Sequence, residues 1–319
     1  MSLHIVIGSG PVGAATARLL AARGEQVRVL TRRGTGPDTA GIEHVAVDAK
    51  DATALREATS GAAVIYNCAA PPYWNWPAEF PPLAASVLAA AEFTGAVLAI
   101  AGNLYGYAPP NGPLVEELPL TATTKKGRVR AQMWLDALAS HQAGRVRVTE
   151  ARASDYLGAG AVSYLTESVL KPLAAGKRAI VPAALDAPHS WTYTGDVART
   201  LIAVADDERG WGRAWHVPSE PAISVRDIAI RAATLAGVRS PRLTAVSERV
   251  LSLSAAFASV RGDEAKMLRA LGEVGYQRRH PWVLDSSDAT ETFGLKPTGL
   301  DDSLRETMRS YIQSPSSSA

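Results

Sequence analysis

The sequence predicts an α/β protein, a doubly wound parallel sheet (the Rossmann fold) with a smaller C-terminal substrate-binding lobe. Short apolar segments of strand length alternate with helical segments through the first half of the chain, which is typical of repeated strand–helix–strand units. A glycine-rich turn at 8–13 connects the first strand to the first helix. The chain has 319 residues, 47% of them hydrophobic, so it can bury a large core without disulfides or metals.

The first half of the chain contains the more regular elements. Apolar runs predict strands at 3–7, 27–30, 45–47, 63–67, 96–101 and 145–151. Helical spacing predicts helices at 14–23, 52–58, 83–94 and 127–141. Because helices connect these strands, the sheet should be parallel, with ligands bound beyond the carboxyl ends of its strands.

The second half is less regular. We expect a strand at 215–217, a helix that begins near Asp196, and further helices at 163–174, 224–236, 246–271 and 305–312. Ser224 is placed to cap the helix 224–236, because a serine hydroxyl can accept a hydrogen bond from a first-turn N–H. These elements should form a lobe that interleaves with the sheet.

The turn Gly8-Ser9-Gly10-Pro11-Val12-Gly13 has the G-x-G-x-x-G spacing of a dinucleotide-binding site. Gly8 allows a tight turn, Gly10 lets a pyrophosphate approach the backbone, and Gly13 lets the helix pack closely on the strand. The N-terminus of the helix then offers N–H groups and a partial positive charge to the phosphates. The strand–turn–helix context favours this interpretation over a turn that is only structural.

The end of the second strand indicates which dinucleotide binds. An NAD site commonly has an acidic residue there for the ribose hydroxyls, whereas this chain has Thr31-Arg32-Arg33. A guanidinium can bind a 2′-phosphate through two hydrogen bonds. We therefore expect NADP as the cofactor, although the two arginines can also be ordinary solvated residues. Residues after the other strands should complete the cofactor site, namely Asp48, Ala49, Cys68, Ala69, Ala70 and Ala101.

The segment 71–82 (PPYWNWPAEFPP) combines four prolines with four aromatic residues. We interpret it as a loop in which Tyr73, Trp74 and Trp76 form a wall of the substrate pocket. A proline-braced loop with its own small core is the alternative. Further residues that we expect near the substrate are Tyr105, Tyr156, His189 and Trp191.

Several segments together resemble the extended short-chain dehydrogenase/reductase family, which includes nucleotide-sugar epimerases and dehydratases. The resemblance covers nearly the whole chain and includes VAVDAKD (45–51), VIYNCAAP (64–71), LYGYAPP (104–110), ARASDYLGAG (151–160) and TYTGDVARTL (192–201). The glycine turn departs from the G-x-x-G-x-x-G spacing that is common in this family.

The resemblance implies three catalytic groups, a Ser or Thr, a Tyr, and a Lys four residues after the Tyr. At the corresponding positions this chain has Ala101, Lys126 and Arg130. Arg130 can hold ribose or phosphate oxygens but cannot release its proton. Lys126 can supply the proton if its surroundings favour the neutral amine, or it can be a solvated cation at a helix start. Tyr107 is a second candidate for the missing phenol, since Tyr105 has a structural counterpart in the family.

Two functions remain open at this point. The first is an NADP(H)-dependent oxidoreductase that acts on a carbonyl or alcohol of a small hydrophobic or aromatic substrate. The second is an NADP-binding protein without net redox turnover, such as an isomerase, cyclase, lyase or redox-sensing regulator. We expect residues 1–160 to bind NADP, residues 161–313 to form the substrate-binding lobe and residues 314–319 to be a disordered tail.

Composition narrows the possible partners. The net charge is only +2 and the cationic residues are dispersed, which argues against nucleic acid and membrane surfaces. The single cysteine excludes an intramolecular disulfide and favours the cytoplasm. The six histidines are scattered, so no metal site is expected. A monomer or a homodimer that binds a small-molecule substrate is the expected state.

Overall fold

The computed structural model describes residues 1–247 and 272–313, so most of the expected helix 246–271 and the tail 314–319 lie outside the described residues. Its centre is a seven-stranded sheet in which all neighbouring strands are parallel, with the order β10-β6-β5-β4-β1-β2-β3. The strands are β1 (Leu3–Ile7), β2 (Gln26–Thr31), β3 (Ile42–Ala46), β4 (Val64–Asn67), β5 (Val97–Asn103), β6 (Arg147–Ala153) and β10 (Ala214–His216). This order confirms the doubly wound sheet.

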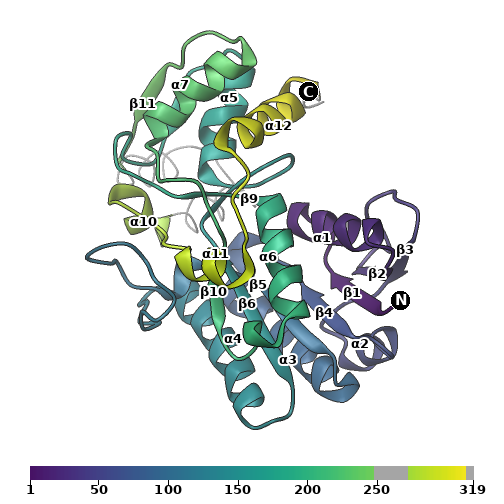
Figure 1. Ribbon diagram of the computed structural model, residues 1–319. Helices are drawn as coiled ribbons and strands as arrows, with labels where there is room; N and C mark the ends of the chain where they lie inside the picture. The colour runs from purple at the N-terminus through teal and green to yellow at the C-terminus, as the bar shows by residue number, and fades with distance from the viewer. Residues whose placement is uncertain (248–271, 314–319) are drawn as a thin grey trace.

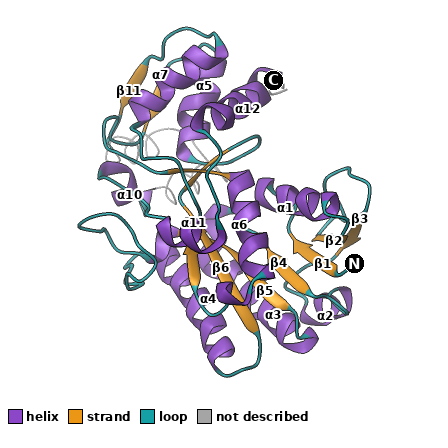
Figure 2. Ribbon diagram, in the orientation of Figure 1, coloured by secondary structure: helices purple, strands orange, loops and turns teal. Residues whose placement is uncertain are grey.

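Helices cover both faces of the sheet (Figures 1 and 2). One face packs against α1 (Pro11–Ala22) and α6 (Thr194–Asp206), and the other packs against α2 (Ala52–Ala58), α3 (Trp76–Thr94) and α4 (Lys125–Gln142). Because side chains alternate along a strand, Val6 joins the first core while its neighbours Ile5 and Ile7 join the second. Both faces are therefore apolar, which explains the continuous apolar runs in the sequence.

Helix α3 begins earlier than expected, and the prediction of a loop over 71–82 was wrong. After a 3₁₀ turn, η1 (Tyr73–Asn75), the helix starts at Trp76 and contains Pro81 and Pro82. The rings of Trp76 and Phe80, one helical turn apart, lie 5.0 Å from each other, and Phe80 is buried. This packing outweighs the backbone hydrogen bonds that the two prolines remove.

The C-terminal lobe has a core of its own (upper part of Figure 1). Its helical elements are the π-helical turn η3 (Thr166–Leu170), α5 (Lys171–Ala174), α7 (Val225–Ala236) and α12 (Leu300–Gln313). It also contains two pairs of short parallel strands. One pair is β7 (Asp155–Leu157) with β9 (Trp191–Tyr193), and the other is β8 (Ala179–Val181) with β11 (Leu243–Ala245). These three-residue strands are too short for a recognisable alternation of apolar and polar residues. The predicted cap of α7 is confirmed, since the Ser224 hydroxyl accepts a hydrogen bond from the Asp227 N–H at 3.1 Å.

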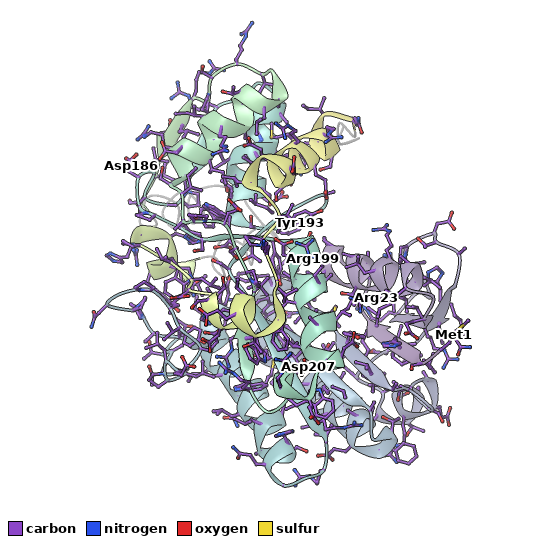
Figure 3. The ribbon with its side chains drawn as sticks, in the orientation of Figure 1. Met1, Arg23, Asp186, Tyr193, Arg199 and Asp207 are labelled. Atoms are coloured by element: carbon purple, nitrogen blue, oxygen red, sulfur yellow. The ribbon has the colours of Figure 1, made fainter. Side chains whose placement is uncertain are left out.

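The lobe and the sheet are joined by chain crossings and by polar contacts. Helix α6 and strand β10 return to the sheet, and α11 (Ser287–Phe293) packs on β10, while the short helix α10 (Tyr276–Arg279) lies toward the lobe. At the base of α12, Figure 3 shows Tyr193 and Arg199 near one another. The Tyr193 hydroxyl donates a hydrogen bond to Glu306, and Arg199 pairs with Asp196. Asp196 also accepts a hydrogen bond from the Thr298 N–H at 2.7 Å, so it links α6 to the segment that precedes α12.

Within residues 1–247 and 272–313, the structure contains no helix with the length and apolar character needed to cross a bilayer.

Candidate functional site

The glycine turn after β1 has the backbone geometry that its spacing predicts. Gly8 has φ +93°, and a Cβ there would lie 2.8 Å from the Ala69 Cα. A Cβ at Gly13 would lie 2.0 Å from the Gly8 carbonyl oxygen, so only glycine permits this approach of helix to strand. At Gly10 a Cβ would meet nothing within 4 Å, which leaves open space above the backbone. The turn thus forms an open cradle at the start of α1.

The N-terminus of α1 faces this cradle without a protein partner among the described side chains. Gly10 is the N-cap residue and Pro11 is the first helical residue, and no described side chain caps the helix. The first N–H groups of a helix need an acceptor, and a phosphate is well suited to them. The residues present therefore fit the pyrophosphate of a dinucleotide.

A cavity of about 280 Å³, here called the turn cavity, extends from the cradle along the ends of β2 and β3. The predicted cofactor residues that line it are Gly8, Gly10, Thr31, Arg32, Asp48, Ala49, Cys68, Ala69 and Ala70. Arg32 is exposed at its edge. Arg33 is also exposed but is not among the lining residues, because the chain turns away after Arg32 into a turn closed by Thr31 and Thr35. We therefore no longer expect Arg33 to contact the cofactor.

A second cavity of about 430 Å³, the central cavity, begins on the other side of Gly10. It contains the expected cofactor residues Pro11, Val12 and Ala101 and the expected substrate residues Tyr73, Trp74, Trp76, Tyr105 and Tyr156. The structure therefore brings most of the predicted site residues to one place, at the carboxyl edge of the sheet.

Arg130 lies in the wall of the central cavity and is buried. One terminal nitrogen, Nη2, donates a hydrogen bond to the Ala101 carbonyl at 2.8 Å and lies 3.9 Å from Glu150. Its buried Nε has no hydrogen-bond partner among the described residues. Burial lowers the pKa of Arg130 from its ordinary value, although Glu150 opposes this shift. An unsatisfied buried donor at a cavity wall is costly unless a ligand oxygen accepts from it.

Arg130 belongs to a buried ionic cluster with Glu150 and Arg152. Arg152 Nε donates to Glu150 at 2.7 Å, and its Nη1 donates to the Tyr107 hydroxyl at 2.6 Å. That hydroxyl also lies 2.9 Å from His216 Nε2. Two guanidinium groups therefore share the carboxylate of Glu150, so Arg130 brings an incompletely balanced positive charge to the cavity.

The same contacts show that Tyr107 is not placed to donate a proton to a substrate. Its side chain is buried between Arg152 and His216 and does not line the central cavity. Burial raises the pKa of Tyr107 to about 12, with Arg152 opposing the shift. Tyr107 follows the 3₁₀ turn η2 (Leu104–Gly106), and of the two tyrosines in this segment only Tyr105 lines the cavity.

Lys126 pairs with a carboxylate and is not among the residues that line the central cavity. Its ammonium forms an ion pair with Glu273 at 2.7 Å and lies 4.7 Å from the centre of the Tyr73 ring. The side chain is buried but does not line the central cavity, whereas Tyr73 does. This arrangement supports a role for Lys126 in holding Tyr73 and Glu273 rather than in proton transfer. The sequence could not indicate it, because Glu273 lies 147 residues away.

His189 and Trp191, which were predicted to lie near the substrate, do not line the central cavity or the lobe cavity. Both are buried, and their rings lie 4.3 Å apart. The Trp191 indole N–H donates to the Ile223 carbonyl in the core of the lobe. His189 Nε2 lies 2.9 Å from a carboxylate oxygen of Asp155, which does line the central cavity. His189 can therefore hold the carboxylate of Asp155 in place without lining the cavity itself.

Asp155 is the main residue of the cavities that was not predicted from the sequence. Its position directly after β6 was the available signal, because ligands bind beyond the ends of parallel strands. Gln277 and Trp282 also line the central cavity, but they come from a distant part of the chain with no local motif. Phe80 lines it because α3 begins early.

A third cavity of about 420 Å³, the lobe cavity, adjoins the central cavity and shares Tyr73, Tyr105 and Asp155 with it. Gln277 also lines both cavities, and the residues that line only the lobe cavity include Tyr164, Glu167 and Arg278. Burial is the main cause that raises the pKa of Tyr73, Tyr105 and Tyr164 above the ordinary value, and the charge of Asp155 adds to each shift. These phenols are therefore neutral hydrogen-bonding groups at neutral pH.

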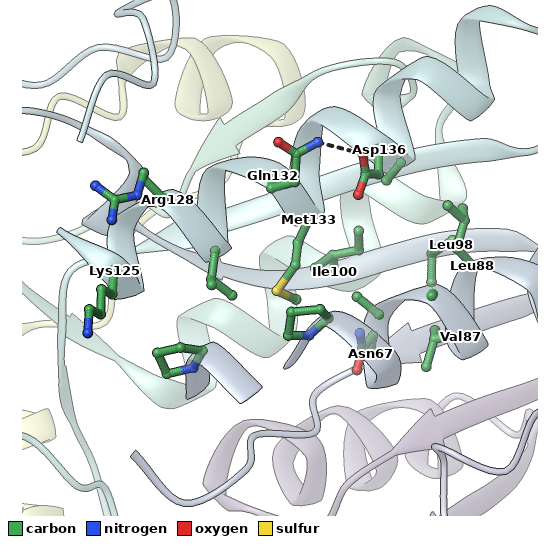
Figure 4. Close-up of a pocket in the computed structure, with 16 residues that line it drawn as sticks. Asn67, Val87, Leu88, Leu98, Ile100, Lys125, Arg128, Gln132, Met133 and Asp136 are labelled. Carbon is green, nitrogen blue, oxygen red and sulfur yellow. Dashed lines mark hydrogen bonds between the residues drawn. The ribbon is translucent and has the colours of Figure 1, made fainter. Parts of the chain in front are cut away.

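A separate groove of about 490 Å³ runs between α3 and α4, outside this site (Figure 4). Its walls are mostly apolar, with Leu88 and Met133 among them, and Lys125 and Arg128 lie at one end. Phe93 on α3 and Leu135 on α4 are exposed on the same two helices.

Comparisons with known proteins agree with this architecture. The sequence model of the "NAD dependent epimerase/dehydratase family" matches residues 5–217. No curated protein matches the sequence significantly. MoeE5 in complex with UDP-glucuronic acid and NAD has a TM-score of 0.77 at 18% identity, covering 98% of this chain and 100% of the other.

Two further solved structures are similar over nearly their whole length. UDP-glucose 4-epimerase from Thermus thermophilus, in complex with NAD, has a TM-score of 0.75 at 16% identity, with 97% of this chain and 98% of the other covered. UDP-glucuronic acid 4-epimerase from Bacillus cereus, also with NAD, has a TM-score of 0.77 at 15% identity, with coverages of 98% and 97%. At these identities the likeness establishes a shared fold.

Proposed function

The chain belongs to the NAD dependent epimerase/dehydratase family, and from this premise we propose that it is an NADP(H)-dependent oxidoreductase for a small, partly aromatic substrate. The single observation that carries the cofactor assignment is the end of β2. Arg32 lines the turn cavity there, and no acidic residue stands at 31–33 to take the ribose hydroxyls. The similar structures named above contain NAD, so NADP is the specific part of the proposal.

Each part of the dinucleotide has residues that would hold it. The Gly8–Gly13 turn and the start of α1 would bind the pyrophosphate. Arg32 would bind the 2′-phosphate, and Asp48 and Ala49 would border the adenine. Arg130, with its unsatisfied Nε, would donate to oxygens of the nicotinamide half. When bound, the nicotinamide supplies hydride exchange with a carbon of the substrate.

The substrate would occupy the central cavity and reach into the lobe cavity. Tyr73, Trp76, Tyr105 and Tyr156 surround this space with aromatic rings. The tyrosine hydroxyls can donate hydrogen bonds to a carbonyl or alcohol oxygen, since burial raises the pKa of Tyr156 to about 12 and keeps it protonated. The protein would thus orient the reacting carbon and exclude water.

Titration of the purified chain with NADP⁺ and NAD⁺ tests the cofactor assignment. We expect NADP⁺ to bind at least about tenfold more tightly, a difference that corresponds to roughly 1.4 kcal/mol. Equal affinities would contradict the role of Arg32. Loss of NADPH absorbance with a panel of aromatic ketones and aldehydes would establish redox turnover.

The second function is an NADP-binding enzyme without net redox turnover, such as an isomerase, cyclase or lyase, or a redox-sensing regulator. The observation that favours it is that Ala101, Lys126 and Arg130, at the three positions of the family's catalytic groups, aim no phenol or lysine into the cavity. Tight NADPH binding without oxidation across the carbonyl panel would support this alternative.

Two further parts of the proposal concern the state of the protein. The single cysteine suits a reducing compartment such as the cytoplasm. The mostly apolar groove between α3 and α4 favours a homodimer over a monomer.

A further inference from the structure

We infer that the lobe cavity recognises a positively charged amino group of the substrate through the carboxylate of Asp155. This inference rests on the proposed function, because it assumes that the cavity beside the cofactor holds the substrate. It adds the chemical class of that substrate, a small organic amine. The position of Asp155, the charge of the cavity and the nature of its walls all support this class.

Asp155 is held in a fixed orientation. The residue belongs to β7, which pairs with β9. Its Oδ2 accepts a hydrogen bond from His189 Nε2 at 2.9 Å. His189 is buried, with its ring 4.3 Å from that of Trp191 and 5.6 Å from that of Tyr164. A buried imidazole that cannot rotate thus fixes the carboxylate.

The second oxygen of this carboxylate is available to a ligand. Among the described residues, Oδ1 of Asp155 has no hydrogen-bond partner, and the side chain is 19% exposed. Asp155 lines both the central cavity and the lobe cavity, so its exposed part faces the space between them. A carboxylate in this position binds an N–H donor best, and a charged donor more strongly than a neutral one.

The charge of the lobe cavity favours a cation. The described residues that line it contain two carboxylates, Asp155 and Glu167, and one guanidinium, Arg278, and no Lys or Arg among the described residues forms an ion pair with Asp155. Glu167 lies at the rim, where its side chain is 45% exposed and approaches Lys171 at 3.4 Å. Asp155 is the deeper of the two carboxylates and the less screened, so it is the better partner.

The walls of the cavity are also suited to a cation. Tyr73, Tyr105 and Tyr164 line it, and the faces of such rings attract cations. The chain already uses two of them in this way, since Lys126 Nζ lies 4.7 Å from the Tyr73 ring centre and the Arg278 guanidinium lies 5.8 Å from that of Tyr164. An aromatic amine would combine ring contacts with the ion pair to Asp155.

Three probes of similar size and different charge test this inference: 2-phenylethylamine, 2-phenylethanol and 3-phenylpropionate. Each is titrated at pH 7 by calorimetry, with and without saturating NADP⁺. We expect the amine to bind at least about tenfold more tightly than the alcohol and the acid to bind most weakly. An alcohol or acid that binds as tightly as the amine, or no saturable amine binding below about 10 mM, would overturn the inference.

Two variants locate the contact. Asp155→Asn keeps an oxygen that can accept a hydrogen bond from His189 but removes the negative charge. The affinity for the amine should therefore fall to the affinity for the alcohol. Glu167→Gln is the matched control and should change amine binding less than about twofold, because this carboxylate is exposed. Persistence of the amine preference in Asp155→Asn, or its loss in Glu167→Gln, would refute the assignment.

The experiments distinguish a failure of this inference from a failure of the proposed function. Binding of NADP⁺ to the wild type and to both variants is measured first, and unchanged affinity confirms that the variants are folded. If NADP⁺ fails to bind but the amine preference is present, the proposed function fails and the amine site stands. If Asp155→Asn does not fold, the ranking of the three probes on the wild type still decides the inference.

Discussion

Replacing Arg32 by aspartate should convert the nucleotide preference of the turn cavity. Arg32 is exposed at the edge of this cavity, where it can bind a 2′-phosphate. A hydrogen bond to a charged group contributes about 1.5–3 kcal/mol. The new carboxylate adds repulsion of about 1 kcal/mol at contact distance in water. Arg32→Asp should therefore weaken NADP⁺ binding by roughly 100-fold or more.

The change for NAD⁺ should be small, because its ribose has two hydroxyls at this place and a carboxylate can accept hydrogen bonds from them. We expect NAD⁺ affinity to change by less than about threefold. Calorimetric titration at low and moderate salt measures both nucleotides, and the NADP⁺ preference of the wild type should decrease with salt.

Arg33→Asp is the matched control for this experiment. It makes the same change in charge one residue further along the chain, at an exposed side chain that does not line the turn cavity. Its effect on NADP⁺ should be less than about threefold. An equal loss of NADP⁺ and NAD⁺ binding in Arg32→Asp would refute the reasoning. So would an effect of Arg33→Asp as large as that of Arg32→Asp.

Four other substitutions have definite expected results. Gly13→Ala should lower the free energy of unfolding in urea by about 2–3 kcal/mol, because its Cβ would overlap a backbone oxygen. Gly10→Ala should leave the free energy of unfolding unchanged, because its Cβ has open space, and should weaken NADP⁺ binding. Lys126→Met should lower the free energy of unfolding by about 1–3 kcal/mol, because Glu273 loses its ion pair. The affinity for the cofactor should be retained. Loss of turnover in a folded variant would show that Lys126 is a proton donor after all. Burial lowers the pKa of His216 from 6.5 to about 4, so its contribution to stability, about 3 kcal/mol, is complete above pH 6.5 and is lost as the pH falls toward 4. His216→Asn should flatten that part of the stability profile, and an unchanged slope would contradict this account.

The parts of the molecule that the sequence predicted are those determined by local chain geometry. The glycine spacing at 8–13 requires a tight turn between strand and helix, so it could be recognised without tertiary information. The same holds for the parallel strands, because continuous apolar runs are needed where both faces of a sheet are covered. Arg32 could be placed because it directly follows a predicted strand.

The parts that were missed depend on contacts between distant segments. The side chains of Tyr107 and His189 lie near the predicted site in sequence, yet each turns toward a buried partner. Lys126 points to Glu273, and nothing in its own helix indicates this. Helix α3 crosses two prolines because its aromatic side chains pack in the core. These conformations are determined by the energy of tertiary packing, which local secondary-structure propensities do not include.

The charges of the three joined cavities differ in a way that bears on the substrate. Arg32 and Arg130 bring positive charge to the part that would hold the dinucleotide, whereas the lobe cavity contains the carboxylate of Asp155, which forms no ion pair with a described Lys or Arg. A nucleotide sugar carries two negative charges on its diphosphate, and the lobe cavity repels such a group. UDP alone should therefore not bind the NADP⁺-saturated protein in a calorimetric titration at concentrations below about 1 mM. Saturable UDP binding to the wild type below that concentration, with no gain in affinity in Asp155→Asn, would show that this carboxylate does not repel diphosphates, and the electrostatic argument for a small cationic substrate would then be wrong.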